Sequence, residues 1–224
     1  MNKLLVFLVF ILSLNLNSQE LYPIGLGGSI YGCVNANGNQ PPKGRQTGIS
    51  LNYIPTLAFS GYLPYSQNNN IGLYFDLGLT NLSYADKSVD YGTQYQTDLS
   101  YLSAAVYLHL NNFLLGANFG LPVSAKHQAE DIGLPYKTDP VETISNLAEL
   151  RVGYQVPVYQ DENGRLLVTV LAGYQFNGIY KNFKKYDPNS EIIPHPNLFP
   201  TEEKHNPRIA SIYIGVSYLI KVIY

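Results

Sequence analysis

Five ionisable side chains are the first candidates for chemistry, because each lies at a polar position of a run in which apolar and polar residues alternate. They are Asp76, His109, Glu149, Arg151 and Lys221. Alternate side chains of a β-strand point to opposite faces, so these five would share the face opposite the apolar one. Charges on a buried face must be paired, which predicts an internal network of salt bridges and hydrogen bonds. The same charges could instead serve a gated pore or a proton-sensitive element.

Catalytic chemistry has weaker support. The other histidines fall in predicted loops: His127, His195 and His205. Near the first of these lie a serine and two carboxylates: Ser124, Glu130 and Asp131. Their spacing defines no catalytic triad, and no Gly-Lys-Ser/Thr sequence follows the glycines of Gly25–Gly28, as a phosphate loop requires. We therefore expect no catalytic residue, no metal site and no cofactor, and we predict that the protein is not an enzyme.

The segment Arg208–Tyr224 indicates the kind of element that positions the five side chains. Its even-numbered residues from Ala210 to Tyr224 are apolar, while the odd-numbered ones are mostly small or polar. This run exceeds both the usual strand of about 5–6 residues and the roughly 9–11 residues of a membrane-spanning strand. As a terminal strand it would expose an unpaired edge unless it pairs with the first strand.

About eight such segments follow one another, and their connections alternate in length. The long ones are Asn35–Gln46, Tyr84–Thr97, Lys126–Asn146 and Tyr180–Pro207, and the shorter ones are Gly61–Asn70, Asn111-Asn112 and Asp161–Gly164. A slip of the alternation at Ile54-Pro55 predicts a bulge, because proline lacks an N–H. The fold predicted is all-β, an eight-stranded antiparallel up-and-down transmembrane β-barrel.

The composition agrees with a barrel whose outer wall faces lipid. Charged residues make up 13% of the chain, against a usual share of about 25%, and the chain has 20 Tyr and no Trp. A lipid-facing Lys or Arg costs about 2–4 kcal/mol near the bilayer centre, so few are expected. The net charge of −2 gives no electrostatic footprint for nucleic acid. A secreted soluble β-domain, such as a lipocalin-like binder, is the alternative and would bury the apolar face.

The amino end predicts export. Lys3 precedes the apolar run Leu4–Leu14, and small and polar residues follow to Ser18. This run is too short to span a bilayer as a helix, so residues 1–18 are predicted to be a signal peptide and residues 21–224 the barrel domain. The single cysteine, Cys33, implies neither a disulfide framework nor a lipid anchor.

The stretches Thr97–Val123 and Leu150–Val158 carry most of a resemblance to the small outer-membrane β-barrels of the OmpA/OmpX type. In particular, residues 21–224 resemble the porin-like "outer membrane protein beta-barrel" family of Gram-negative bacteria. The resemblance implies an outer-membrane location at the cell surface, with outer-membrane lipid and lipopolysaccharide as neighbours. It also implies that barrel-assembly machinery recognises the C-terminal residues Tyr218, Val222 and Tyr224.

Two functions remain open for such a barrel. The first is a non-enzymatic structural or binding and adhesion role, in which long extracellular loops contact an unknown extracellular ligand. The second is a narrow channel or small-solute, porin-like transporter. Five tyrosines share the polar face, namely Tyr31, Tyr74, Tyr101, Tyr107 and Tyr213. They favour the first function, because an eight-stranded interior has room for side chains and little else.

Overall fold

The computed structural model of the chain describes residues 24–41, 45–66, 69–89, 94–129, 137–138, 141–181 and 206–222. They form eight long strands, one two-residue strand and one 3-10 turn. The long strands are β1 (Gly25–Asn37), β2 (Arg45–Ser66), β3 (Asn69–Ser88), β4 (Gln94–Leu110), β5 (Phe113–Ala129), β7 (Leu147–Gln160), β8 (Gly164–Gln175) and β9 (Ile209–Lys221). The short elements are β6 (Lys137–Thr138) and η2 (Val141–Thr143).

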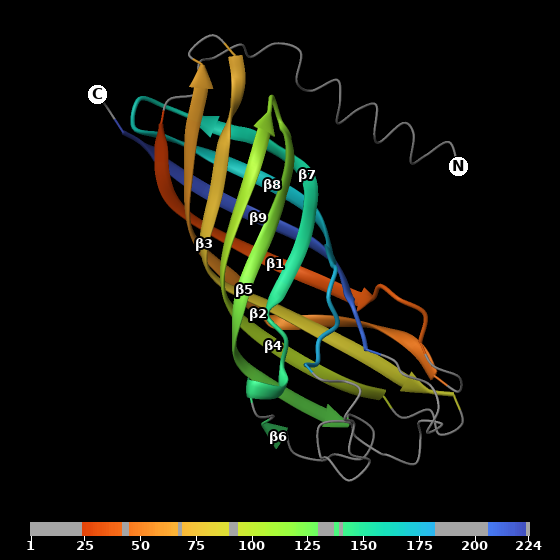
Figure 1. Cartoon of the computed structure of the whole chain (residues 1–224). Helices are drawn as coiled ribbons and strands as arrows, with labels where there is room; N and C mark the ends of the chain where they lie inside the picture. The colour runs from red at the N-terminus through yellow and green to blue at the C-terminus, as the bar shows by residue number, and fades with distance from the viewer. Residues whose placement is uncertain are drawn as a thin grey trace, which may run out of the picture.

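The eight long strands close into an antiparallel barrel (Figure 1). Each strand pairs with its neighbours in the order β4-β3-β2-β1-β9-β8-β7-β5, and a further β4–β5 ladder joins the two ends of this row. The last strand pairs with the first along its whole length, from Gly25 opposite Lys221 to Asn37 opposite Ile209. Closure leaves none of the eight long strands as a free edge, which confirms the predicted pairing of the terminal strand.

The barrel exposes its apolar side chains and buries its polar ones. In β9, Ile212 and Ile214 are 56% and 62% exposed, whereas Tyr213 between them is buried. The same alternation leaves Val106 of β4 and Val170 of β8 exposed on the outer wall, as the sequence predicts. This arrangement is the inverse of a water-soluble core, and it excludes the lipocalin-like alternative.

The connections distinguish two ends of the barrel. At the end where β1 begins and β9 finishes, which we call the turn end, β4 and β5 are joined by Asn111 and Asn112, and Asn111 has a positive φ of 58°. The β7–β8 turn lies at the same end, since Lys221 N–H donates to the carbonyl of Asn163. The opposite end, which we call the loop end, carries the connections β1–β2, β3–β4, β5–β7 and β8–β9; β6 marks it in Figure 1.

A capped turn joins β7 to β8. The carboxylate of Asp161 accepts the backbone N–H groups of Gly164 and Asn163, each at 2.9 Å. These two donors lower the pKa of Asp161 below its ordinary value, because they stabilise the charged form. The predicted turn at Asp161–Gly164 is therefore confirmed, with its aspartate as the organising side chain.

The strands extend further toward the loop end than the sequence predicts. β3 continues to Ser88 and β4 starts at Gln94, so most of the predicted loop Tyr84–Thr97 is paired strand. β5 likewise continues to Ala129, inside the predicted loop Lys126–Asn146. The loop predictions were too long because polar residues were assigned to loops, while here they continue the ladders beyond the apolar band.

Prolines lie at the breaks in strand register. The shifts adjoin or enclose Pro55, Pro64, Pro122 and Pro157. Proline has no N–H to donate to a ladder, so a strand that contains it bulges at that point. The bulge expected at Ile54-Pro55 is confirmed.

At the largest break, side-chain amides replace lost backbone pairing. The β2–β3 ladder is interrupted between Gly48 and Leu57. There the Asn52 amide donates to the Leu82 carbonyl at 2.9 Å, and the Asn81 amide donates to the Pro55 carbonyl at 2.8 Å. These bonds satisfy carbonyls that would otherwise be buried without partners.

The predicted signal peptide, residues 1–18, and the terminal aromatic residue Tyr224 lie outside the described residues. No helix within the described ranges is long and apolar enough to cross a bilayer.

Candidate functional site

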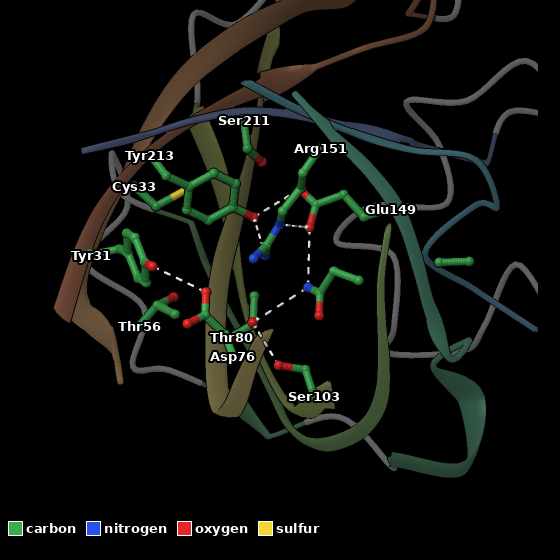
Figure 2. A network of polar contacts seen from close by, with 12 residues as sticks. Tyr31, Cys33, Thr56, Asp76, Thr80, Ser103, Glu149, Arg151, Ser211 and Tyr213 are labelled. Atoms are coloured by element: carbon green, nitrogen blue, oxygen red, sulfur yellow. Dashed lines mark hydrogen bonds and ion pairs between the residues drawn. The ribbon is translucent and has the colours of Figure 1, made fainter. Parts of the chain in front are cut away.

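The centre of the barrel is organised around the guanidinium group of Arg151 on β7 (Figure 2). Its Nε donates to Glu149 Oε2 at 2.8 Å, and one terminal nitrogen donates to the Tyr213 hydroxyl at 3.0 Å. The other terminal nitrogen donates to the Tyr107 hydroxyl at 3.1 Å. Arg151 also lies 4.3 Å from the centre of the Tyr213 ring. A planar guanidinium with five donors can bond partners on several strands at once, here on β4, β7 and β9.

Glu149 accepts hydrogen bonds from three of the surrounding side chains. Besides Arg151, the Tyr213 hydroxyl donates to Oε1 at 2.8 Å and the Asn118 amide donates to Oε2 at 3.2 Å. The carboxylate fits because Gly173 of β8 has no side chain: a Cβ there would lie 2.1 Å from Glu149 Oε1. The pair is thus held by four strands and is almost fully shielded from solvent.

Asp76 on β3 forms a separate polar cluster. Its carboxylate accepts the Tyr31 hydroxyl at 3.0 Å, and it also accepts the Ser60 hydroxyl (Figure 2 shows the Tyr31 bond). Ser29 then bonds Ser60 and donates to Ser217 at 2.6 Å. Asp76 is therefore a buried carboxylate held by hydroxyl donors, and no direct bond joins it to Arg151 among the contacts of the described residues.

His109 belongs to a third cluster, toward the turn end. Its ring packs edge-on against Tyr62, with ring centres 5.1 Å apart. The guanidinium of Arg165 belongs to the same cluster and lies over the Tyr62 ring, 4.7 Å from its centre. Leu114, Leu167 and Leu219 are buried in the same hydrophobic core, so side chains fill the barrel at this end too.

Two chain segments pair with each other at the loop end, one at and after the end of η2 and one after β8. Ser145 N–H donates to the Ile179 carbonyl at 2.7 Å, and Lys181 N–H donates to the Thr143 carbonyl at 2.7 Å. Ile144 and Ile179 are fully buried in the hydrophobic core. We call these segments, Thr143–Asn146 and Gly178–Lys181, the loop-end lid.

The structure places four of the five predicted network residues inside and one outside. Asp76, His109, Glu149 and Arg151 are all buried on the inner face, but in three clusters instead of one. Lys221 is exposed, which corrects its placement in the lumen: it has the inward parity, but β9 ends there, beyond the filled interior. The five tyrosines expected in the lumen are all buried.

Other interior residues were missed by the sequence reasoning. Arg165 is buried. It has the same parity as Thr169, so extending the alternation of β8 back to the turn would have identified it. Tyr62 was assigned to a predicted turn, whereas it lies on β2 opposite Tyr74. Asn118 shares the polar parity of β5, but nothing in the sequence indicates that it bonds Glu149.

The residues considered for catalysis do not come together in the described part of the chain. His127 lies on β5 opposite Thr97, which corrects its assignment to a loop. His195, His205, Glu130 and Asp131 lie outside the described residues. Within the described ranges no group of His, Cys, Asp and Glu could hold a metal ion. The polar groups around Arg151 bond one another, so this arrangement suits a structural role.

Cys33 is a free, buried thiol in the same interior. Its Sγ donates to Asn35 Oδ1 at 3.0 Å, and the hydroxyl of Ser211 donates to the same oxygen at 2.8 Å. Neighbouring β1 and β9 are thus linked through one asparagine.

Comparison with known proteins returned no matching family model and no matching curated protein. Among solved structures, the Ail attachment invasion locus protein of Yersinia pestis, in complex with the heparin analogue sucrose octasulfate, is 13% identical, with a TM-score of 0.33, over 87% of this chain and 98% of Ail. Neisserial surface protein A, NspA, is 13% identical, with a TM-score of 0.39, over 89% and 97%. OprG of Pseudomonas aeruginosa is 11% identical, with a TM-score of 0.29, over 92% and 100%.

The class of the protein follows from its own geometry. Eight antiparallel strands close on themselves, apolar side chains cover the outside, and polar and aromatic side chains fill the inside. This is the architecture of small eight-stranded transmembrane β-barrels, of which the OmpA/OmpX type is an example.

Proposed function

We propose that the protein is a non-enzymatic barrel of the outer membrane whose lumen is closed and whose recognition surface is the loop end. The observation that carries this proposal is the filled interior. Side chains occupy it at three levels: the His109 and Tyr62 cluster, the Arg151 network, and the buried isoleucines of the loop-end lid. A rigid, closed scaffold with long connections at one end is suited to binding through those connections.

The outer wall supports the membrane location. Its exposed apolar side chains would be unfavourable in water, and acyl chains would cover them. Outer-membrane lipid and lipopolysaccharide are thus the proposed neighbours. Barrel-assembly machinery is the proposed partner during insertion, and it would read Tyr218, which is exposed on the wall, together with Val222 and Tyr224.

The membrane location is tested by fractionation combined with a heat-modifiability gel. We expect the protein in the outer-membrane fraction, migrating differently before and after boiling because the closed barrel resists detergent. A soluble fraction with identical migration in both lanes would contradict the proposal.

The recognition role is tested by shortening the β8–β9 connection. Deletion of Asp187–Pro200, which lies outside the described residues, is expected to leave the heat-modifiable band intact and to abolish binding or adhesion of whole cells to a host-cell or matrix surface. The matched control is an insertion of similar size in the turn-end loop at Glu162-Asn163, which should leave adhesion unchanged. Equal adhesion of the deletion variant and the intact protein would refute a binding role for this connection.

One observation favours the channel alternative. Both amide atoms of Gln175, the hydroxyl of Tyr101 and Oδ1 of Asn118 are buried and have no hydrogen-bond partner within the described part of the protein. Buried polar groups of this kind usually bond ordered water. Water in the loop-end half of the interior would shorten the part of the barrel that side chains close, which would favour conduction. Conductance measurements therefore decide between the two functions.

A further inference from the structure

An apolar groove crosses the outer wall where β3, β2, β1, β9 and β8 lie side by side. It is shallow and open along most of its surface, with a volume of about 610 Å³. Gly28 of β1 is one of its lining residues. The register partners of Gly28 are Phe59 of β2 and Tyr218 of β9, so the groove opens where a glycine interrupts a row of large side chains.

The chemistry of the lining selects a hydrocarbon. Ile30, Leu57 and Phe59 are each about half exposed and present only carbon to the groove. Ser29 also lines it, but Ser29 is buried and its hydroxyl bonds Ser60 and Ser217 within the barrel. Among the lining residues, only Tyr218 brings a polar group to the rim. A polar ligand would find almost no hydrogen-bonding partners here, whereas an acyl chain needs none.

The position of Tyr218 places one end of the groove at the turn end of the barrel. A Cβ on Gly164, in the β7–β8 turn, would lie 3.0 Å from the Tyr218 hydroxyl. Leu166, another lining residue, follows that turn directly. Tyrosines of membrane proteins are enriched at the level of the lipid head groups, with the ring toward the apolar core. The groove thus starts at head-group level and rises into the apolar band.

We propose that this groove binds one acyl chain of a phospholipid from the leaflet at the turn end, which is the periplasmic side. The inference rests on the outer-membrane location proposed above. The groove is continuous with the exposed apolar wall, so a chain already in contact with the wall gains further burial by entering it. Phe59 and Tyr218 flank the chain, and Gly28 lets it approach the strand backbone.

The test uses the absence of Trp from the native sequence. Phe59→Trp places a single fluorophore in the groove, and Phe119→Trp is the matched control, since Phe119 is an exposed aromatic on β5 that does not line the groove. Each variant is refolded in detergent and titrated with phosphatidylethanolamine carrying dibrominated acyl chains, which quench Trp on contact. We expect half-quenching of Trp at position 59 at an at least about threefold lower lipid fraction than at position 119.

Filling the groove provides the second arm. A Cβ at Gly28 would lie 3.7 Å from its nearest neighbour, the Ala58 carbonyl oxygen, so Gly28→Leu fills the groove without backbone conflict. Gly32→Leu is the control, since Gly32 faces outward on the same strand with a Cβ distance of 3.9 Å to the Ile214 carbonyl. Gly28→Leu should bring the position 59 curve to that of position 119, and Gly32→Leu should leave it unchanged.

The other outcomes are distinct. Equal curves at the two positions, before any change at Gly28, would overturn the inference. Weaker quenching at position 59 with a doubled mass in sedimentation would overturn it in favour of a second copy of the chain on this face. If neither position is quenched in vesicles made wholly of brominated lipid, the membrane location itself fails, and the groove assignment fails with it.

Discussion

Arg151 connects three strands of the barrel interior through its guanidinium group. It bonds side chains of β4, β7 and β9, and its partner Glu149 adds Asn118 of β5. Burial of such a pair is costly, and removal of one partner leaves the other charge uncompensated. The network therefore holds the strands in one register as long as it is complete.

Removal of Arg151 alone should consequently cost more than removal of the pair. We expect Arg151→Met to lower the free energy of unfolding by about 3–5 kcal/mol, and Arg151→Met with Glu149→Gln to lower it by less. Urea unfolding in lipid vesicles of the wild type, both single variants and the double variant measures the coupling. Strictly additive single-variant effects would show that the two side chains do not act as a pair.

Gly173 permits the position of Glu149, and its replacement tests the network from outside its members. Gly173→Ala would place a methyl group 2.1 Å from Glu149 Oε1, so the carboxylate must move away from Arg151. We expect a loss of about 1–3 kcal/mol in unfolding free energy, as is usual for overpacking. Gly32→Ala, on the open outer wall, should stay within about 0.5 kcal/mol. In a Glu149→Ala background the cost at Gly173 should largely vanish, and an unchanged cost there would contradict this cause.

At the scale of the elements, β8 shows how each strand separates two environments. Val170 is exposed on the outer wall, while Thr169 is fully buried and accepts the Gln155 amide at 2.9 Å. We expect Thr169 to tolerate only a polar side chain of similar size, because it is fully buried in the interior. One strand thus meets hydrocarbon on one face and a filled polar core on the other.

Val170→Arg should therefore cost about 2–4 kcal/mol if this position lies near the bilayer centre. Thr169→Ser, which keeps the hydroxyl and the volume to within one methyl, should cost much less. Refolding titrations of both variants into lipid vesicles give the comparison. Similar losses at both positions would rule out the assignment of the two faces.

The alternation of side chains predicts the strand faces and the buried tyrosines, because a period of two needs only local sequence. The barrel closure is predicted separately, from the edge that the terminal strand would otherwise leave unpaired. It could not predict the partition of the polar residues into three clusters, since this depends on strand tilt and register across the sheet. Lys221 shows the limit: its parity is inward, but its level along the barrel leaves it exposed. Asn118 shows the same limit, since its contact with Glu149 joins residues 31 positions apart.

At the scale of the whole molecule, the two ends should face opposite sides of the membrane. Glu142→Cys, at an exposed position of η2 at the loop end, is expected to react with an impermeant maleimide on intact cells. Asn112→Cys, in the β4–β5 turn, should react only after lysis, because short turns face the periplasm. Both are made in a Cys33→Ser background, in which the serine can keep the bond to Asn35.

Asn189, within the long β8–β9 connection but outside the described residues, is expected to behave like Glu142. Labelling of Asn112→Cys on intact cells without labelling of Glu142→Cys would invert the orientation of the barrel.

The closed interior is the central claim, and planar-bilayer recording of the purified, refolded protein tests it most directly. Side chains of the His109 and Tyr62 cluster, the Arg151 network and the loop-end lid fill the lumen. We therefore expect no conductance above that of the bare membrane. Arg151→Ala with Tyr213→Ala, which opens the central level, serves as the variant most prone to conduct. Steady, reproducible conductance steps from the wild-type protein would contradict the account and establish a channel.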